Sequence, residues 1–268
     1  MQLRRIHILF PQGRNKALTF SYDDGRQEDR RLVSIFRKHG LKATFNLNSG
    51  EADTDERRIP INEWKELYDG FELASHTVNH PPIDRCPLSL VAQEIMEDRK
   101  AIEAVTGYPV RGFAYPFGSF TPEIISLLPS LGIRYGRIVG DSDGFAIPED
   151  FYKWKATCHH NHRLLENAEA FLSINNDFRL NLMYVWGHSY EFTNNDNWDV
   201  IERFASLAGG RDDIWYATNI EIVDYMDAAR RIIFSADHSL VSNPSAMDVW
   251  LSVDDMPVIV PGGKTIAI

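Results

Sequence analysis

The sequence has little cysteine and no long hydrophobic run. Its two cysteines, Cys86 and Cys158, are too few for a disulfide framework and lack the paired spacing of a zinc ribbon, so we interpret them as reduced, packed thiols. No segment approaches the roughly 18 apolar residues that a membrane-spanning helix needs. The apolar stretch within residues 1–11 is shorter than a signal-peptide core of about 7–15 residues. We therefore expect no membrane span and a cytoplasmic location, or secretion if a leader has been removed.

Positive charge is in deficit, because 28 Lys and Arg face 38 Asp and Glu and leave a net charge of −10. Such a field repels nucleic acid and anionic lipid, so neither is an expected partner. The composition is otherwise ordinary and excludes collagen-like, coiled-coil and wholly disordered chains. A chain of 268 residues can form one large α/β domain with a small appendage. Its oligomeric state is not encoded in these features.

Two common functional signatures are missing. The chain lacks the Gly-x-Gly-x-x-Gly turn that binds dinucleotides. Gly263-Lys264-Thr265 imitates the end of a phosphate-binding loop, but Val258 stands where the first glycine should be. We interpret that match as chance.

The chain does contain a regular alternation of strand and helix patterns. Short β-branched or aromatic runs are followed by stretches with apolar residues at helical spacing, and capping or turn residues separate them. The predicted strands cover 17–22, 42–47, 71–74, 110–114, 133–139, 154–158, 180–186 and 214–217. The predicted helices cover 28–39, 62–70, 89–106, 121–132, 167–174, 197–209 and 218–231, the last opened by a capping box.

This alternation favours right-handed crossovers and a mainly parallel sheet, and with so many units a closed sheet is more economical than a very wide open one. We predict an α/β fold, with a distorted (β/α)7-8 barrel over residues 1–231. Residues 232–268 change to short β-rich pieces between turn signals, and we predict a small antiparallel extension packed on the barrel. Catalytic side chains should lie just after strands, on one rim.

Two predicted strand ends carry groups that suit a metal. Asp23 and Asp24 follow the first strand, where one carboxylate can bind an ion while the other handles a proton; a solvated Asp-Asp-Gly turn is the alternative. His76 and His80 follow the third strand, and on one helical turn both imidazoles could reach one ion; surface or capping histidines are the alternative. Thr77 stands where the zincin motif has glutamate, so any base must come from elsewhere.

Two further strand ends carry groups that suit acyl transfer. Arg111 could hold a carboxylate ionised, and backbone N–H groups in the turn that begins with Tyr115-Pro116 could donate to an oxyanion. His188 closes an apolar strand and could protonate a leaving amine near neutral pH. Taken singly, these are also consistent with an ordinary arginine, a turn and a structural histidine.

In this order the four motifs resemble the polysaccharide deacetylase (NodB homology) family of metal-dependent carbohydrate esterases, over about residues 16–231. The resemblance implies that Asp23 is the catalytic base. It implies that a divalent ion is held by Asp24, His76 and His80; zinc is the default, and cobalt, nickel, manganese or iron(II) also suit these ligands. It further implies three roles, namely Arg111 as the partner of the base, Tyr115 at the oxyanion and His188 as the general acid.

The chain departs from the family pattern at three places. One is the spacing from Arg111 to Tyr115, which is one residue longer than the usual Arg-x-x-Tyr. A Ser-Tyr pair stands between Thr-Phe and the two aspartates, and the Asp-Trp motif that supports the acid histidine has no clean equivalent. Asp150 with Trp154 is one candidate set for that support, and His159 or His160 is another.

The expected function is metal-dependent hydrolysis of an N- or O-linked acetyl group, with an acetylated carbohydrate as the partner. Three alternatives remain, namely an amidohydrolase acting on a small cyclic amide or ureide, an iron(II) oxygenase using the same ligand triad, and a non-catalytic carbohydrate-binding homologue. The sugar and its linkage are not encoded in the motifs.

Overall fold

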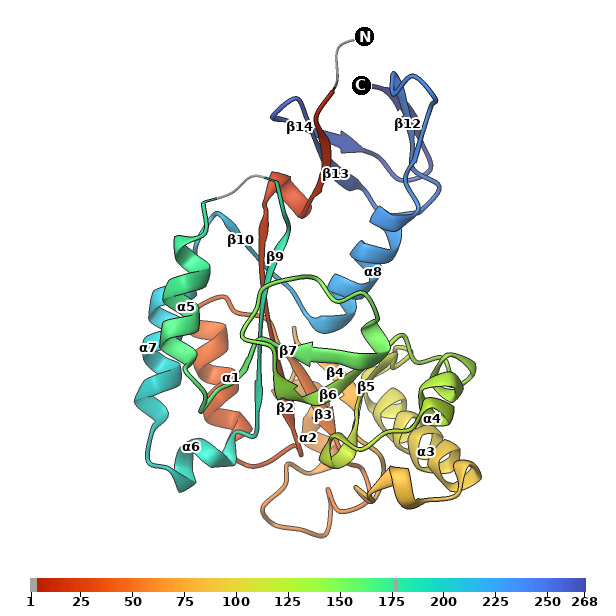
Figure 1. The fold of residues 1–268 in the computed structure, drawn as a ribbon. Helices are drawn as coiled ribbons and strands as arrows, with labels where there is room; N and C mark the ends of the chain where they lie inside the picture. The colour runs from red at the N-terminus through yellow and green to blue at the C-terminus, as the bar shows by residue number, and fades with distance from the viewer. Residues whose placement is uncertain (1–3, 176–177) are drawn as a thin grey trace.

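The computed structural model describes residues 4–175 and 178–268, and its centre is a parallel sheet curled into a barrel (Figure 1). The sheet has the strand order β7-β6-β5-β4-β3-β2-β9-β8, with β10 beside β2, and every pairing in it is parallel. Its strands are β2 (Lys16–Asp23), β3 (Thr44–Leu47), β4 (Glu72–Ser75), β5 (Gly112–Ala114), β6 (Tyr135–Asp141), β7 (Trp154–Ala156), β8 (Cys158–His159), β9 (Asn181–Gly187) and β10 (Ile214–Tyr216). The predicted α/β barrel is confirmed.

Helices follow most of these strands and cover the outside of the barrel (Figure 1). They are α1 (Asp29–Lys38), α2 (Ile61–Leu67), α3 (Leu88–Thr106), α4 (Pro122–Leu127), α5 (Leu164–Ser173), α6 (Tyr190–Asn194), α7 (Trp198–Ala208) and α8 (Asn219–Arg230). Short 3-10 turns cover Pro11–Gly13, Ile83–Arg85, Pro116–Gly118, Leu128–Leu131 and Phe151–Lys153. The capping box predicted at Thr218 and Glu221 opens α8. No helix within the described residues has the length and apolarity to cross a bilayer.

The barrel is nearly closed at Thr157, which lies between β7 and β8 in the chain. Its backbone forms hydrogen bonds to both ends of the sheet. Its N–H donates to the carbonyl of Tyr184 in β9 at 2.8 Å, and its carbonyl accepts from the N–H of Asp143 after β6 at 2.9 Å. The chain thus crosses from one edge of the sheet to the other at this residue. The carboxyl ends of β2, β4, β6 and β9 consequently face a common rim.

The extension consists of two antiparallel sheets at the opposite end of the barrel (Figure 1). One contains β13 (Val249–Val253) and β14 (Met256–Val260), and the other contains β11 (Ile233–Phe234), β12 (Leu240–Ser242) and β15 (Thr265–Ala267). The first sheet also takes β1 (Ile6–Leu9), which pairs with β13. The predicted division at residue 231 therefore needs one change, because β1 belongs to the extension and not to the barrel. The sequence could not predict this, because the pairing of two segments so far apart in the chain leaves no local pattern.

Glu72 ties the barrel together at the amino ends of its strands. It is buried at the start of β4 and accepts hydrogen bonds from the Thr44 hydroxyl at 2.7 Å, the Tyr135 hydroxyl at 2.9 Å and the Ile220 N–H at 2.9 Å. These donors come from β3, β6 and α8. Burial raises the pKa of Glu72 to about 7, even though the three hydrogen bonds act in the opposite direction.

Replacement Glu72→Gln should change how stability depends on pH. An unfolded chain has a Glu pKa of about 4.3, so the folded state binds more protons up to about pH 7. The wild-type free energy of unfolding should therefore fall relative to that of Glu72→Gln as the pH rises through this interval, by at most about 1.4 kcal/mol per pH unit, and then level off. Urea unfolding from pH 4.5 to pH 8 measures this difference. The exposed control Glu97→Gln should follow the wild type, and a difference for Glu72→Gln that is constant with pH would contradict the assignment.

Candidate active site

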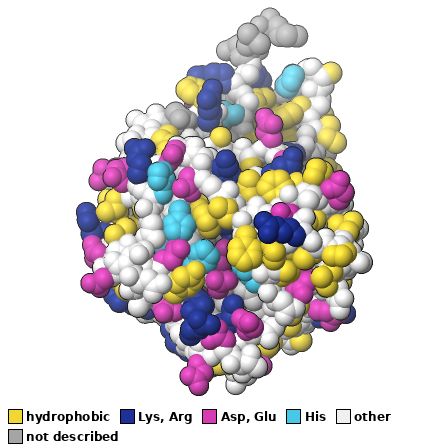
Figure 2. Space-filling view, turned by 60° about the horizontal axis from the view of Figure 1, so that its bottom comes forward, with side chains coloured by type: hydrophobic (Ala, Val, Ile, Leu, Met, Phe, Trp, Pro, Cys, Tyr) yellow, Lys and Arg dark blue, Asp and Glu magenta, His cyan; other side chains and the backbone are white. Residues whose placement is uncertain are grey.

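The rim at the carboxyl ends of the strands is the face turned forward in Figure 2, where histidine and acidic side chains gather. Asp23 ends β2, and Asp24 follows it with a φ of 78°. Gly25 also has a positive φ, and a Cβ there would lie 2.9 Å from the Leu47 side chain, so this tight turn suits glycine. The turn directs two adjacent carboxylates into different surroundings, since Asp23 is buried and Asp24 is half-buried.

Asp24, His76 and His80 offer ligand atoms that all lie within 4.8 Å of one another. The two imidazoles face each other, with 3.1 Å between their Nε2 atoms. The spacing predicted that His76 and His80 share one helical turn, but the structure has no helix at these residues. Thr77 and His80 have φ values of 68° and 51°, so a left-handed loop, rather than an i and i+4 helical face, brings the rings together.

Hydrogen bonds to two buried polar side chains, Asp98 and Asn48, hold the loop that carries His76 and His80. Asp98 of α3 accepts hydrogen bonds from the Ser75 hydroxyl at 2.6 Å and the His76 N–H at 3.1 Å. The Asn48 side chain donates to the carbonyls of His76 at 2.6 Å and Thr77 at 3.0 Å. A β-branched residue at positive φ is strained, and these bonds offset the strain.

The tautomer of His76 suits a metal ligand. Its Nδ1 lies 2.7 Å from the carbonyl oxygen of Ala114, which can only accept, so Nδ1 carries the proton and Nε2 keeps its lone pair. Burial lowers the pKa of His76 to about 4, so the ring is neutral at pH 7. Two imidazoles and one carboxylate match the donors that divalent transition metals prefer, and the residues therefore fit such an ion.

Asp23 lies beside this triad, buried and ionised. Its carboxylate forms an ion pair with the guanidinium of Arg137 and accepts a hydrogen bond from the Asn46 amide at 2.8 Å. The Nε2 atoms of His76 and His188 each lie 3.8 Å from its Oδ2. Burial favours the neutral acid, but the charge of Arg137, assisted by the histidines and Asn46, outweighs it and lowers the pKa of Asp23 to about 2.

The predicted pairing of Arg111 with Asp23 is wrong. Arg111 precedes β5 and forms two hydrogen bonds of 2.8 Å with Asp224 of α8. It lies at the amino end of that short strand, about 10 Å along the strand from its carboxyl end. The arginine beside Asp23 is Arg137 of β6, fully buried with its guanidinium 4.7 Å from the centre of the Trp186 ring. The sequence gives no sign of this, because it depends on where the neighbouring strands begin.

Tyr115 does not offer its backbone N–H to the site, which is a second correction. That N–H donates to the carbonyl of Arg137 at 3.1 Å in the sheet, and the Tyr115 hydroxyl donates to the carbonyl of Tyr152 at 2.8 Å. Phe117, two residues later in the same turn, is the residue that reaches the rim. It has a φ of 56°, and its exposed ring lies 4.5 Å from the ring of His80.

His188 contacts a carboxylate that the sequence analysis missed. Its Nδ1 lies 3.3 Å from Oε1 of Glu191 in α6, and Oε2 of Glu191 lies near His159 and His160 at the end of β8. Burial lowers the pKa of His188, but Glu191 and Asp23 outweigh it and raise the pKa above the ordinary value. The spacing of three residues between His188 and Glu191 was the one available signal.

The other candidate supports for His188 are placed elsewhere. Asp150 accepts the N–H of Tyr152 at 2.8 Å and caps a 3-10 turn. Trp154 is buried in the core and packs on Tyr184, with 4.7 Å between the ring centres. Neither contacts His188 within the described part of the chain, whereas His159 and His160 reach it through Glu191.

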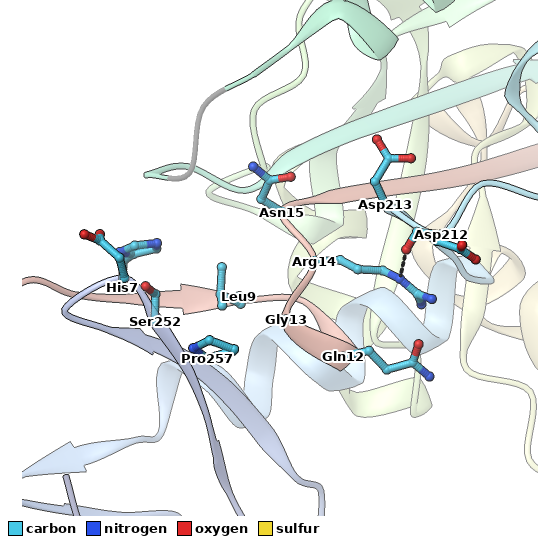
Figure 3. A pocket seen from close by; sticks show the side chains of 11 residues that line it. His7, Leu9, Gln12, Gly13, Arg14, Asn15, Asp212, Asp213, Ser252 and Pro257 are labelled. Carbon is cyan, nitrogen blue, oxygen red and sulfur yellow. Dashed lines mark hydrogen bonds between the residues drawn. The ribbon is translucent and has the colours of Figure 1, made fainter.

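A separate cavity of about 340 Å³ lies at the far end of the barrel, against the extension (Figure 3). Its lining includes His7, Leu9, Arg14 and Ser252, and the Arg14 side chain donates to the carbonyl of Asp212 at 2.7 Å. The lining contains none of the rim residues described above. This cavity is therefore distinct from the candidate site.

Residues 11–136 match the family described as "Polysaccharide deacetylase". This part of the chain is therefore similar to the polysaccharide deacetylase family. The match covers the strand ends that carry Asp23, Asp24, His76 and His80 and stops just before Arg137. The predicted resemblance is thus confirmed.

Curated relatives agree with the family. A peptidoglycan-N-acetylglucosamine deacetylase from Listeria monocytogenes is 23% identical over 112 residues, 41% of this chain and 23% of the relative. A chitooligosaccharide deacetylase from Rhizobium leguminosarum is 28% identical over 114 residues, 41% of this chain and 48% of the relative. The chain thus matches less than half the length of each relative.

Solved structures share the fold at low identity. A Mycobacterium smegmatis protein assigned to the polysaccharide deacetylases has a TM-score of 0.62 at 16% identity, and the match covers 83% of this chain and 94% of that chain. A protein from Bacillus anthracis that is described as a CE4 family pseudoenzyme has a TM-score of 0.52 at 17% identity, covering 80% and 66%. The barrel is therefore a fold of this family.

Replacement Arg137→Met should destabilise the fold far more than Arg111→Gln. The first change leaves the buried carboxylate of Asp23 without its charge partner, which typically costs about 3–5 kcal/mol. The second removes a partly exposed pair with Asp224, worth about 1 kcal/mol or less. Urea unfolding at pH 7 compares the two variants. An equal loss in the free energy of unfolding for both variants would mean that the ion pair of Arg137 contributes no more to stability than that of Arg111.

Proposed function

We propose that this chain is a metal-dependent deacetylase that hydrolyses N- or O-linked acetyl groups of a carbohydrate. One observation carries the proposal, namely that the ligand atoms of Asp24, His76 and His80 converge beside a buried, ionised Asp23. His188 also lies near Asp23, with 3.8 Å between its Nε2 and Oδ2 of Asp23. The family match and the deacetylase relatives support the substrate class.

In this proposal Asp24, His76 and His80 hold the ion. A bound divalent ion lowers the pKa of water and polarises a carbonyl oxygen as a Lewis acid. Zinc is the default for two imidazoles and one carboxylate with open positions, although cobalt, nickel, manganese and iron also suit these donors. The neutral ring of His76, with its lone pair on Nε2, supports this assignment.

The side chains around the ion divide the proton transfers between them. Asp23 is kept ionised by Arg137, so it can accept a proton from the attacking water. His188 has a raised pKa and can donate a proton to the departing amine or alcohol. The exposed ring of Phe117 borders His80 and offers an apolar surface against which a sugar face can pack.

A non-catalytic carbohydrate-binding protein is the second candidate, because one structural relative is itself described as a pseudoenzyme. It predicts binding of acetylated sugars without release of acetate. An amidohydrolase acting on a small cyclic amide or ureide predicts turnover of those compounds instead.

Acetate release from acetylated chitin, xylan and peptidoglycan fragments tests the proposal. We expect release from at least one of these substrates, and a loss of about 100-fold or more in Asp23→Asn, because a general base contributes about 10²–10⁴-fold. The exposed Asp84→Asn serves as the matched control and should retain activity. Full activity of Asp23→Asn, or sugar binding without any acetate release by the wild type, would refute the proposal.

Removal of the metal should abolish the same activity. A chelator is expected to stop acetate release, and a divalent ion added back should restore it in the wild type but not in His76→Ala. The exposed His238→Ala is the control and should retain both the metal and the activity. Acetate assays combined with elemental analysis measure both properties. Chelator-resistant turnover by metal-free protein would exclude the assigned ligands.

A further inference from the structure

A second group of histidines surrounds Glu191. Nε2 of His159 lies 3.0 Å and Nε2 of His160 lies 3.1 Å from Oε2 of Glu191, and Nδ1 of His188 lies 3.3 Å from Oε1. The first two histidines come from the end of β8, whereas Glu191 follows His188 in α6. Ligand atoms of His159, His160 and Glu191 lie within 4.8 Å of one another, so their spacing alone would also suit a metal.

The tautomer of His159 argues against an ion in this cluster. The N–H of Asn161 donates to Nδ1 of His159 at 3.1 Å, so Nδ1 is an acceptor that carries no proton. The proton of the neutral ring is then on Nε2, the atom that faces Glu191, and a metal ligand must be deprotonated there. His76 has the opposite arrangement, because its Nδ1 faces the carbonyl of Ala114. The two clusters therefore contain similar residues but suit different roles.

His160 is a fixed support for Glu191. Its side chain is fully buried and stacks between the rings of Tyr22, at 5.7 Å, and Phe192, at 4.0 Å. Gly187 makes room for it, since a Cβ there would lie 2.1 Å from Nδ1 of His160. The carboxylate of Glu191 thus contacts the fixed ring of His160, just after β8, and the ring of His188.

We propose that Glu191 is the positioning residue for His188, holding Nδ1 so that Nε2 faces Asp23, and that His159 and His160 serve to hold Glu191 instead of a second ion. This inference rests on the proposed function, in which His188 protonates the leaving group. Glu191 contacts none of the reacting atoms and acts only through His188. The charge of Glu191 also contributes to the raised pKa of His188, together with Asp23 and Asp24.

The test compares Glu191→Gln with Glu191→Asp and with the exposed control Glu169→Gln. Glu191→Gln should lower kcat by about 10–100-fold with little change in KM, as expected for loss of a group that orients another. Glu191→Asp should restore part of that loss, and Glu169→Gln should behave as the wild type. Unchanged kcat in Glu191→Gln would overturn the inference.

Two readouts do not depend on turnover. Proton and nitrogen NMR of the imidazoles should show a strong, charge-assisted hydrogen bond from Nδ1–H of His188 in the wild type and Glu191→Asp, and a weaker one in Glu191→Gln, whose amide oxygen is an uncharged acceptor. Elemental analysis after loading with zinc should give one ion per chain in the wild type and in Glu191→Gln alike. Two ions per chain with one lost in Glu191→Gln, or an unaltered His188 signal, would overturn the inference. A wild type without acetate release would instead defeat the proposed function while these signals still decide the role of Glu191.

Discussion

The ion pair between Asp23 and Arg137 is the interaction on which the rest of the site depends. Both side chains are buried, and burial alone would keep the carboxyl group of Asp23 neutral. The guanidinium reverses this preference and keeps a negative charge on Asp23, whose Oδ2 lies 3.8 Å from Nε2 of His76 and 3.8 Å from Nε2 of His188. A buried charge is tolerated only with such a partner, so the pair couples the stability of the barrel to the chemistry of its rim.

The tautomers of the histidines explain how one rim can hold two similar clusters with different uses. A carbonyl group faces Nδ1 of His76, and a backbone N–H faces Nδ1 of His159. The backbone around each ring thus decides which nitrogen is free, and only His76 presents a lone pair to its cluster. In the proposed function, the loops after β4 and β8 thus decide which of the two clusters holds the ion.

Local patterns in the sequence were enough to predict the barrel and to predict that five site residues lie on one rim. Asp23 ends a strand and Asp24, His76, His80 and His188 lie in the segments that follow strands, and strand ends can be recognised from short apolar runs. The curve of the His76–His80 loop could not be predicted, because its left-handed residues are held by Asp98 and Asn48, which are distant in the sequence.

The partners of these residues were harder to predict because they depend on tertiary structure. Arg111 precedes β5 and Arg137 lies in the neighbouring strand β6, and only the length and register of these strands decide which arginine reaches Asp23. The same register pairs the backbone N–H of Tyr115 with the carbonyl of Arg137, so this N–H is not available to the site. Glu191 lies in a helix of five residues, too short for a periodic pattern to reveal.

Anomalous diffraction from crystals grown with zinc tests the central claim most directly. The account predicts one strong peak, bonded to a carboxylate oxygen of Asp24 and to Nε2 of both His76 and His80, with Asp23 beside it paired to Arg137. A peak bonded instead to His159, His160 and Glu191, or no peak at the Asp24 triad in zinc-loaded crystals, would contradict it.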